Sequence, residues 1–204
     1  MTSSSHAPES RLQLAQSRLL EPFGLTEAHL HEALATIRAH QVDDADLYFQ
    51  YSRSEGWSLE EGIVKSGSFS IDQGVGVRAV SGEKTAFAYS DVISQASLID
   101  AAKTVRTIAA AGRSGKVKQA ATRWVQPHAL YESADPIVSL DSATKVALLE
   151  RIERMARARD PRVVQVMAGL ASEHEVVMVV RADGTMAARS EERRVGKECL
   201  RLCR

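Results

Sequence analysis

The stretch Ser58–Asp91, SLEEGIVKSGSFSIDQGVGVRAVSGEKTAFAYSD, decides the fold of this chain. Apolar residues alternate with others at Phe69 and Ile71 and again from Val75 to Ala79, and glycines interrupt the stretch at 62, 67, 74, 76 and 82. Alternation with a period of two is typical of half-buried strands, and glycines between such runs favour tight turns. The stretch therefore predicts short antiparallel strands joined by turns.

The composition is that of a globular protein, with 204 residues of which 44% are hydrophobic and 25% charged. Lys plus Arg and Asp plus Glu are equal at 26, so bulk charge gives no reason to expect nucleic acid or an anionic membrane as a partner. No apolar run approaches the about 18 residues of a membrane-spanning helix, and the N-terminus does not resemble a signal peptide. The only cysteines, Cys199 and Cys203, cannot form a disulfide framework for the body. These features predict a cytoplasmic protein.

Three amphipathic helices are predicted outside the opening stretch, at residues 26–40, 94–111 and 141–159. Thr26, Ser94 and Asp141 stand at the start of each, and apolar residues recur at helical spacing within each. In the third helix the apolar face is expected to consist of Val146, Leu149, Ile152 and Met155. A shorter helix is expected near residues 12–20, ended by Pro22 and Gly24, and residues 1–10 read as a disordered lead-in.

Strands are predicted at residues 42–52, with a turn at 54–57, and at residues 163–171 and 175–181. Asp183-Gly184 is a hairpin signal, and residues 113–138 form a long connection. The fold class is therefore α+β, a mostly antiparallel twisted sheet of short strands with about three amphipathic helices packed on it. After Ala188 the alternation ends, so the strand that should follow the hairpin turn is expected to break off there.

Two glycine motifs in the opening stretch resemble phosphate-binding loops. Gly74-Val75-Gly76 begins like a dinucleotide fingerprint, but Ala79 stands where the third glycine belongs and no helix follows. GVRAVSGEKT at 76–85 approximates a P-loop, but Glu83 precedes Lys84 and would repel phosphates. Strand and turn glycines are the favoured interpretation of both.

The histidine motifs also lack the second ligand that a zinc site requires. His31-Glu32 and His174-Glu175 begin like a zinc-protease helix, but Ala35 and Met178 stand at the second ligand position. His29 and His31 point to different sides of a helix because they are two residues apart. We expect all of these histidines to lie on the surface.

The remaining candidates have structural interpretations as well. Asp43, Asp44 and Asp46 lack the glycine and distal Glu of a calcium loop and are expected to form turns. Cys199 and Cys203 are four apart and could offer two thiolates on a helix, but no further ligand is evident. Four aromatic residues at strand positions are expected in the core or in cross-strand pairs: Trp57, Phe69, Phe87 and Tyr89.

Several separated segments together resemble the N-terminal domain of the TldD/PmbA family of metallopeptidases. The segments are AD at 45–46, the opening stretch at 58–91, AAKTVRTIA at 101–109, LYESADP at 130–136 and RADGTMAA at 181–188. The resemblance covers residues 11–188 and is specific, because the order, the spacing and the amino-acid sequences of the segments all match.

The resemblance implies a cytoplasmic, zinc-dependent peptidase that processes or degrades peptides and unfolded polypeptides. It also implies a homodimer, or a heterodimer with a PmbA-like (TldE) subunit. In the family the zinc ligands and the general-base glutamate come from an HExxxH helix, with a further cysteine ligand, in a C-terminal domain. No HExxxH occurs in this sequence. No catalytic, cofactor-binding or metal residue is therefore expected here, and the chain is expected to be an inactive N-terminal fragment that binds no zinc.

Residues 189–204 are expected to be a tail foreign to the family, spurious or frameshifted, which would leave the last hairpin incomplete. A second hypothesis of a different class follows from that incompleteness. In it the chain is a non-catalytic peptide-binding or dimerisation module that offers an exposed sheet edge from the region 69–88 to an extended partner. A phosphate or nucleotide binder is a distant third.

Overall fold

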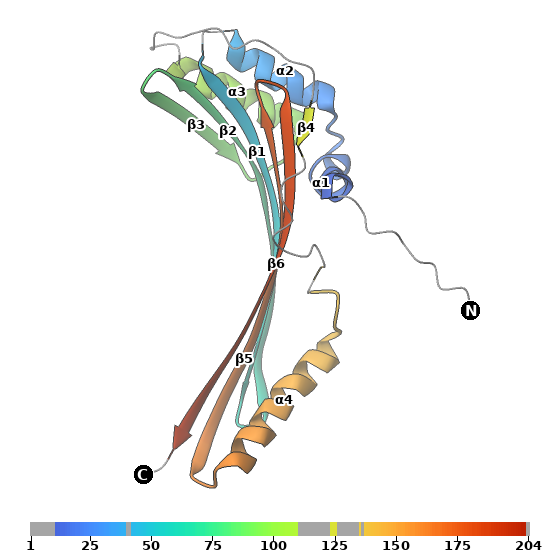
Figure 1. Cartoon of the computed structure of the whole chain (residues 1–204), viewed down its shortest axis with the longest axis vertical. Coiled ribbons are helices and arrows are strands. Elements are labelled where there is room, and N and C mark those ends of the chain that lie inside the picture. The colour runs from blue at the N-terminus through green and yellow to red at the C-terminus, as the bar shows by residue number, and fades with distance from the viewer. Residues whose placement is uncertain (1–10, 40–41, 110–122, 126–134, 136, 203–204) are drawn as a thin grey trace, which may run out of the picture. The chain divides into compact units, whose positions relative to one another are not determined.

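The computed structural model describes residues 11–39, 42–109, 123–125, 135 and 137–202. Within these residues the backbone confirms the α+β class, with four α-helices and a mostly antiparallel six-stranded sheet (Figure 1). The strands are β1 (Asp44–Glu60), β2 (Ile63–Ser81), β3 (Lys84–Ser90), β4 (Arg123–Val125), β5 (Val163–Arg181) and β6 (Thr185–Leu202). The helices are α1 (Arg11–Leu19), the 3-10 turn η1 (Glu21–Phe23), α2 (Glu27–Arg38), α3 (Gln95–Ala109) and α4 (Ser142–Arg159).

The sheet has the order β3-β2-β1-β5-β6-β4. β2 and β3 pair antiparallel from Val75 with Ser90 to Ser81 with Lys84, and the short β4 pairs parallel with β6. No helix in the described part of the chain is both long and apolar enough to cross a membrane. The predicted lead-in at 1–10 and most of the connection at 113–138 lie outside the described residues.

The strands are longer than the sequence predicts. Residues 54–57, expected to turn, lie inside the 17-residue strand β1, and the two predicted runs at 163–181 form the single strand β5. The chain reverses instead at Glu61 and Gly62, whose φ angles are 52° and 74°. Positive φ at both central residues is the geometry of a two-residue hairpin turn that matches strand twist. Most glycines of the opening stretch therefore lie within strands, because only positions with positive φ require glycine for a turn.

The strand after Thr185 does not break off at Ala188, and that prediction is wrong. β6 runs from Thr185 to Leu202 beside the 19-residue strand β5. Alternation of apolar and polar side chains indicates only that one face of a strand is buried. Pairing between two strands requires backbone N–H and C=O groups, and any residue except proline supplies both. The residues Glu175–Arg181 therefore have a hairpin partner.

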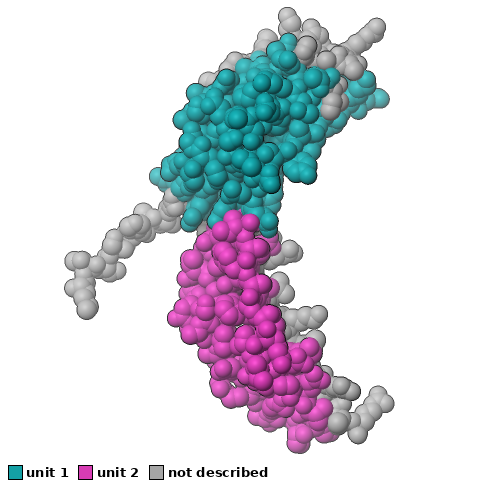
Figure 2. All heavy atoms as spheres, turned by 180° about the vertical axis from the view of Figure 1, so that it is seen from behind, with its two compact units in different colours: residues 1–51, 72–130, 176–190 teal, residues 52–71, 131–175, 191–204 magenta. Residues whose placement is uncertain are grey.

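The chain divides into two compact units (Figure 2). Unit 1 comprises residues 1–51, 72–130 and 176–190. Its core packs α2 and α3 against one face of the sheet through Leu34, Leu98 and the fully buried Leu47 and Phe49. Thr26 starts α2 as predicted, and its backbone N–H donates to His29 Nδ1 at 3.2 Å. Large apolar side chains on both layers make this the main core of the chain.

Unit 2 comprises residues 52–71, 131–175 and 191–204. Its core is small and packs α4 on the sheet through Leu149, Leu59 and Ala168. The inner face of α4 differs by about one residue from the prediction, because Lys145 and Glu153 are buried while Met155 is 60% exposed. Lys145, Leu149 and Glu153 are spaced four residues apart and therefore lie on the same face of the helix. This buried face includes two charged side chains.

Candidate functional site

Within the described residues, helices cover one face of the sheet of unit 1 and no helix lies on the other face. Along β1, Ala45, Leu47 and Phe49 are fully buried in the core. Successive side chains of a strand point to opposite faces, so the intervening Tyr48 and Gln50 lie on the uncovered face. We call this side of the sheet the open face. Aromatic and charged side chains occupy it.

A pocket of about 310 Å³ lies on the open face across three strands. It is lined by Tyr48 and Gln50 of β1, residues 72–76 of β2, Phe87, Tyr89 and Ser90 of β3, and Asp91. This volume is at the lower end of ligand pockets and is large enough for one side chain or a small molecule.

Two glycines of β2 form the floor of this pocket. A Cβ at Gly74 would lie 2.8 Å from the carbonyl oxygen of Ser90, and a Cβ at Gly76 would lie 3.0 Å from two ring carbons of Phe87. The absence of a side chain therefore lets the Phe87 ring lie directly on β2, as aromatic residues commonly do over glycines of a neighbouring strand. The sequence favours strand or turn glycines here, and both lie inside the strand β2.

The aromatic residues at the pocket contradict the prediction of core positions. Phe87 is 58% exposed and Tyr89 is 78% exposed. Their ring centroids are 6.3 Å apart and their planes differ by 22°. The two residues are neighbours along one strand face rather than a cross-strand pair. Phe69 is likewise exposed, and only Trp57 packs as expected, half-buried against the core of unit 2 and over Gly67.

Polar groups at the pocket are acidic rather than basic. Asp72 and Asp91 are both exposed, and the lining side chains include no lysine or arginine. The Ser90 hydroxyl donates to the carbonyl oxygen of Val92 at 3.1 Å and accepts from its N–H at 3.1 Å. That hydroxyl is therefore used to shape the end of β3, and the two carboxylates are the ionic groups that the pocket offers to a ligand.

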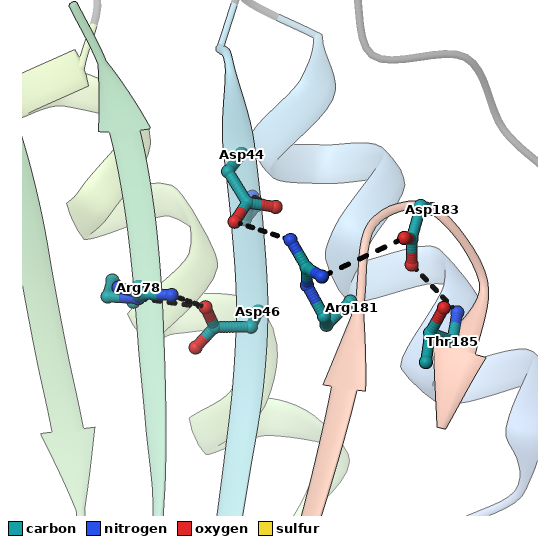
Figure 3. A network of polar contacts seen from close by, with 7 residues as sticks. Asp44, Asp46, Arg78, Arg181, Asp183 and Thr185 are labelled. Carbon is teal, nitrogen blue, oxygen red and sulfur yellow. Dashed lines mark hydrogen bonds and ion pairs between the residues drawn. The ribbon is translucent and has the colours of Figure 1, made fainter. Parts of the chain in front are cut away.

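A network of carboxylates and guanidinium groups continues along the same sheet (Figure 3). Arg78 Nε donates to Asp46 Oδ2 at 2.8 Å, and Arg181 Nη2 donates to Asp44 Oδ2 at 3.0 Å. The hydrogen bond from Arg78 to Asp46, followed by their charge attraction, raises the pKa of Arg78. The hydrogen bond to Asp44 raises the pKa of Arg181 in the same way. These are charge-assisted contacts between neighbouring strands, and they neutralise both aspartates.

The three aspartates at the start of β1 thus have different roles. Asp43 Oδ2 accepts the N–H of Gly82 at 2.6 Å. Asp43 therefore stabilises the β2–β3 turn, which agrees with the turn role that the sequence predicts for these aspartates. Asp44 and Asp46 lie inside β1, where ion pairs replace the expected turn contacts. Asp183 accepts the backbone N–H of Thr185 at 2.9 Å, which lowers the pKa of Asp183.

A second group of charged side chains is buried in unit 2. Lys145 Nζ lies 2.5 Å from Glu55 Oε1 and donates to the carbonyl oxygen of Ile137 at 2.6 Å, with the two side chains only 4% and 8% exposed. Arg53 and Asp135 form an ion pair beside them, and His174 Nδ1 lies 3.9 Å from Asp135 Oδ2. His174 is 3% exposed, so its predicted surface position is wrong. The nearby carboxylate of Asp135 explains why a histidine can be buried here.

The two histidines that begin like a zinc-protease motif lie on elements of different kinds. His174 lies in β5, where residues four apart are about 13 Å from one another along the strand, too far to share a metal ion. His31 lies on α2 with Ala35 one turn later. Among the described residues, no three His, Cys, Asp or Glu side chains gather closely enough to hold a metal ion. Cys199 lies in β6, not on a helix, and Cys203 lies outside the described part of the chain.

Sequence reasoning missed both the pocket and the buried charges. The pocket combines residues of three strands, and its signal was the pair Gly74 and Gly76 within an alternating run. For the buried charges the signal was Lys145, which stands one turn before Leu149 on the apolar stripe of α4. A charged residue in register with an apolar stripe indicates a buried ion pair when a partner strand can supply the opposite charge.

Family models match both halves of the chain. Residues 45–109 match the PmbA/TldA metallopeptidase domain 1, and residues 135–193 match the PmbA/TldA metallopeptidase central domain. Together the two matches cover more than half of the chain, in the order domain 1 and then central domain.

Curated relatives agree with these matches. A metalloprotease TldD homolog of Haemophilus influenzae is 45% identical over 177 residues, which are 87% of this chain and 37% of that protein. A metalloprotease TldD homolog of Buchnera aphidicola subsp. Acyrthosiphon pisum is 36% identical over 176 residues, or 86% of this chain and 36% of that protein. The chain therefore spans about a third of the length of the curated relatives it matches.

Solved structures share the fold at low sequence identity. A Bacteroides thetaiotaomicron protein, described as a candidate modulator of DNA gyrase, superposes with a TM-score of 0.66 at 11% identity over 87% of this chain and 41% of that one. TldE from Thermococcus kodakarensis superposes with a TM-score of 0.56 at 12% identity over 87% of this chain and 43% of that one. At these identities the likeness concerns the fold alone.

Proposed function

Because the chain belongs to the TldD/PmbA metallopeptidase family, we propose that it supplies the N-terminal part of a cytoplasmic, zinc-dependent peptidase that processes or degrades peptides and unfolded polypeptides. The observation that carries this proposal is the match of domain 1 and the central domain in their family order along one chain. The zinc ligands and the general base belong to an HExxxH segment outside these 204 residues, so this chain by itself is inactive and binds no zinc.

Within the intact protein we assign the open face of unit 1 to the wall of the substrate cleft. The support for this role is a pocket whose walls are exposed aromatic rings and whose rim carries two carboxylates. Exposed aromatic residues that surround a hollow commonly mark binding surfaces. The intact protein acts as a homodimer or with a PmbA-like (TldE) subunit, a proposal supported by the fold that this chain shares with a TldE structure.

Zinc content and peptide hydrolysis test the proposal together. The purified 204-residue chain is expected to contain no stoichiometric zinc by elemental analysis and to leave a fluorescent unfolded polypeptide uncut. The Haemophilus influenzae relative, assayed in parallel with and without a chelator, serves as the full-length comparison and is expected to cleave only without chelator. One tightly bound zinc together with cleavage by the 204-residue chain would overturn the assignment of catalysis to another segment.

A second candidate function is a non-catalytic peptide-binding or dimerisation module that uses a sheet edge. The original reason for it, a missing hairpin partner for residues 175–181, does not hold, because β6 supplies that partner. A different observation favours it. β3 pairs with β2 only from Val75 onward, so residues 63–71 have no partner strand on that side within the described residues. Ile63, Phe69 and Ile71 are more than half exposed there, as in edges that accept an added strand.

Light scattering and peptide binding distinguish this alternative. If the edge mediates association, the chain should dimerise or bind unfolded peptide, and the double substitution Phe69→Lys with Ile71→Lys should abolish that association. A matched double substitution at Val138 and Leu140, which are exposed outside the sheet, should leave it unchanged. A monodisperse monomer without affinity for peptides would remove the module hypothesis.

A further inference from the structure

The pocket on the open face of unit 1 has the chemistry of a site for one basic side chain. We infer that it binds an arginine or lysine side chain of a peptide, with the cationic group on the rings of Phe87 and Tyr89 and beside the carboxylates of Asp72 and Asp91. The inference rests on the proposed function only in that it takes the occupant to belong to a peptide.

The first support is the aromatic wall. Phe87 and Tyr89 present exposed ring surface to the pocket, and their planes differ by only 22°. The face of an aromatic ring attracts cations, and a planar guanidinium stacks on it especially well. Because Gly76 allows the Phe87 ring to lie on β2, this wall is held by packing and needs little ordering when a ligand enters.

The second support is the charge at the rim. Asp72 and Asp91 are the ionisable acids of the lining, and no lysine or arginine of the lining neutralises them. This differs from Asp44 and Asp46 on the same sheet, which are paired with Arg181 and Arg78. The chain as a whole has a net charge of zero, so the acidic character is local to the pocket. A cationic partner is the complement of two carboxylates above an aromatic wall.

The third support is size. A volume of about 310 Å³ suits a single long side chain and does not suit a folded partner or a large cofactor. The chemically distinct occupants of that size are a neutral apolar side chain and a basic one. The two carboxylates favour the basic side chain, and the neutral one is an outcome of the test.

The test is a titration of the 204-residue chain, followed by NMR at the amides of residues 72–76 and the ring of Tyr89, with three blocked tripeptides. They carry arginine, the neutral isostere citrulline or leucine between two glycines. The arginine peptide is expected to shift the pocket signals and to bind about fivefold more tightly than citrulline, as expected for one exposed cation–aromatic contact and one surface ion pair. Added salt should reduce this preference.

Substitutions distinguish the contribution of the two carboxylates from that of the aromatic rings. Asp72→Asn with Asp91→Asn should remove the preference for arginine over citrulline, whereas Glu83→Gln, at an exposed acid of the β2–β3 turn outside the lining, should retain it. Tyr89→Ala should weaken both peptides. All positions are exposed, so the variants are expected to fold, as circular dichroism can verify. Equal binding of arginine and citrulline, a preference for leucine, shifts outside the pocket, or an unchanged preference in the double variant would each overturn the inference. Because no hydrolysis is measured, the result is independent of whether the intact protein is a peptidase.

Discussion

Gly74 and Gly76 determine how closely β3 and its aromatic rings approach β2. At Gly74 the nearest obstacle to a Cβ is a backbone carbonyl 2.8 Å away, which cannot rotate aside. Gly74→Ala is therefore expected to lower the free energy of unfolding by about 1–3 kcal/mol, the usual effect of overpacking. Denaturant unfolding measures this loss. Gly56→Ala is the control, because its nearest neighbour is the rotatable Ser68 hydroxyl at 3.1 Å. Equal losses for both substitutions would contradict the steric explanation.

Helix α4 depends on the buried ion pair between Lys145 and Glu55. Lys145→Met would leave the Glu55 carboxylate buried without its cation and is expected to cost about 3–5 kcal/mol of unfolding free energy. The double variant with Glu55→Leu should recover much of that loss, since two apolar residues replace the pair. Lys103→Met on α3 is the control, because its contact with Asp100 is exposed and its loss should cost less than about 0.5 kcal/mol. A double variant no more stable than the single one would show that the charges are not coupled.

The start of α4 should respond to acid. Asp141 Oδ1 accepts the N–H of Thr144 at 2.6 Å, and this hydrogen bond lowers the pKa of Asp141 below its ordinary value of 3.8. A carboxyl group whose pKa is lower in the folded state than in the unfolded state stabilises the fold. Its full contribution is present at pH values above the unfolded-state pKa and is lost as the pH falls through the folded-state pKa.

Asp141→Asn retains a good cap without a titrating group, so its unfolding midpoint should fall less than that of the parent chain below about pH 4. Thermal melts followed by circular dichroism across this range provide the measurement. Asp100→Asn, at an exposed acid inside α3, should behave like the parent. If Asp141→Asn and the parent chain lose stability in parallel, the cap does not control the acid response.

At the scale of the whole molecule, the two units have unequal cores. The core of unit 1 draws buried side chains from α1, α2, α3 and the strands, whereas that of unit 2 consists of Leu59, Leu149 and Ala168 with a few half-buried neighbours. Local opening requires less free energy where few apolar contacts are lost. Amide hydrogen exchange should therefore be faster in residues 52–60 of β1 than in residues 44–51 of the same strand.

The substitution Leu149→Ala tests whether the small core of unit 2 opens independently of unit 1. It should cost about 2–5 kcal/mol locally and should accelerate exchange mainly within unit 2. Ala158→Gly, at an exposed position of the same helix, is the control and should cost no more than about 1 kcal/mol. Uniform acceleration across both units would show that the chain opens as one cooperative body.

Most helices could be predicted from the sequence, because capping and spacing of 3.6 residues are local properties. α2, α3 and α4 begin within one residue of the predicted starts at Thr26, Ser94 and Asp141. Strand lengths could not be predicted in the same way, since a glycine or serine inside a run reads as a turn until a neighbouring strand is known to pair with it. This is why residues 54–57 read as a turn. The residues beyond Ala188 read as the end of the strand for a different reason, because their side chains do not alternate although their backbone continues in β6.

The candidate site was less predictable than the fold. No site residue was expected in this chain, and the pocket arises from Tyr48, Gly76 and Phe87, which belong to three different strands. Alternation showed that Phe87 and Tyr89 share a face, but it could not show which face the helices cover. The buried position of His174 likewise depends on Asp135, which lies far from it in the sequence.

The sequence alone determined the α+β class, the capped helices and the resemblance to a metallopeptidase family. These follow from neighbours along the chain or from the residues that its segments share with the family. Only the tertiary structure decided that α2 and α3 cover one face of the sheet and leave Phe87, Tyr89, Asp72 and Asp91 around a pocket on the other. The physical reason is that burial is a property of packed layers, and a strand's own alternation is the same whichever face becomes the core.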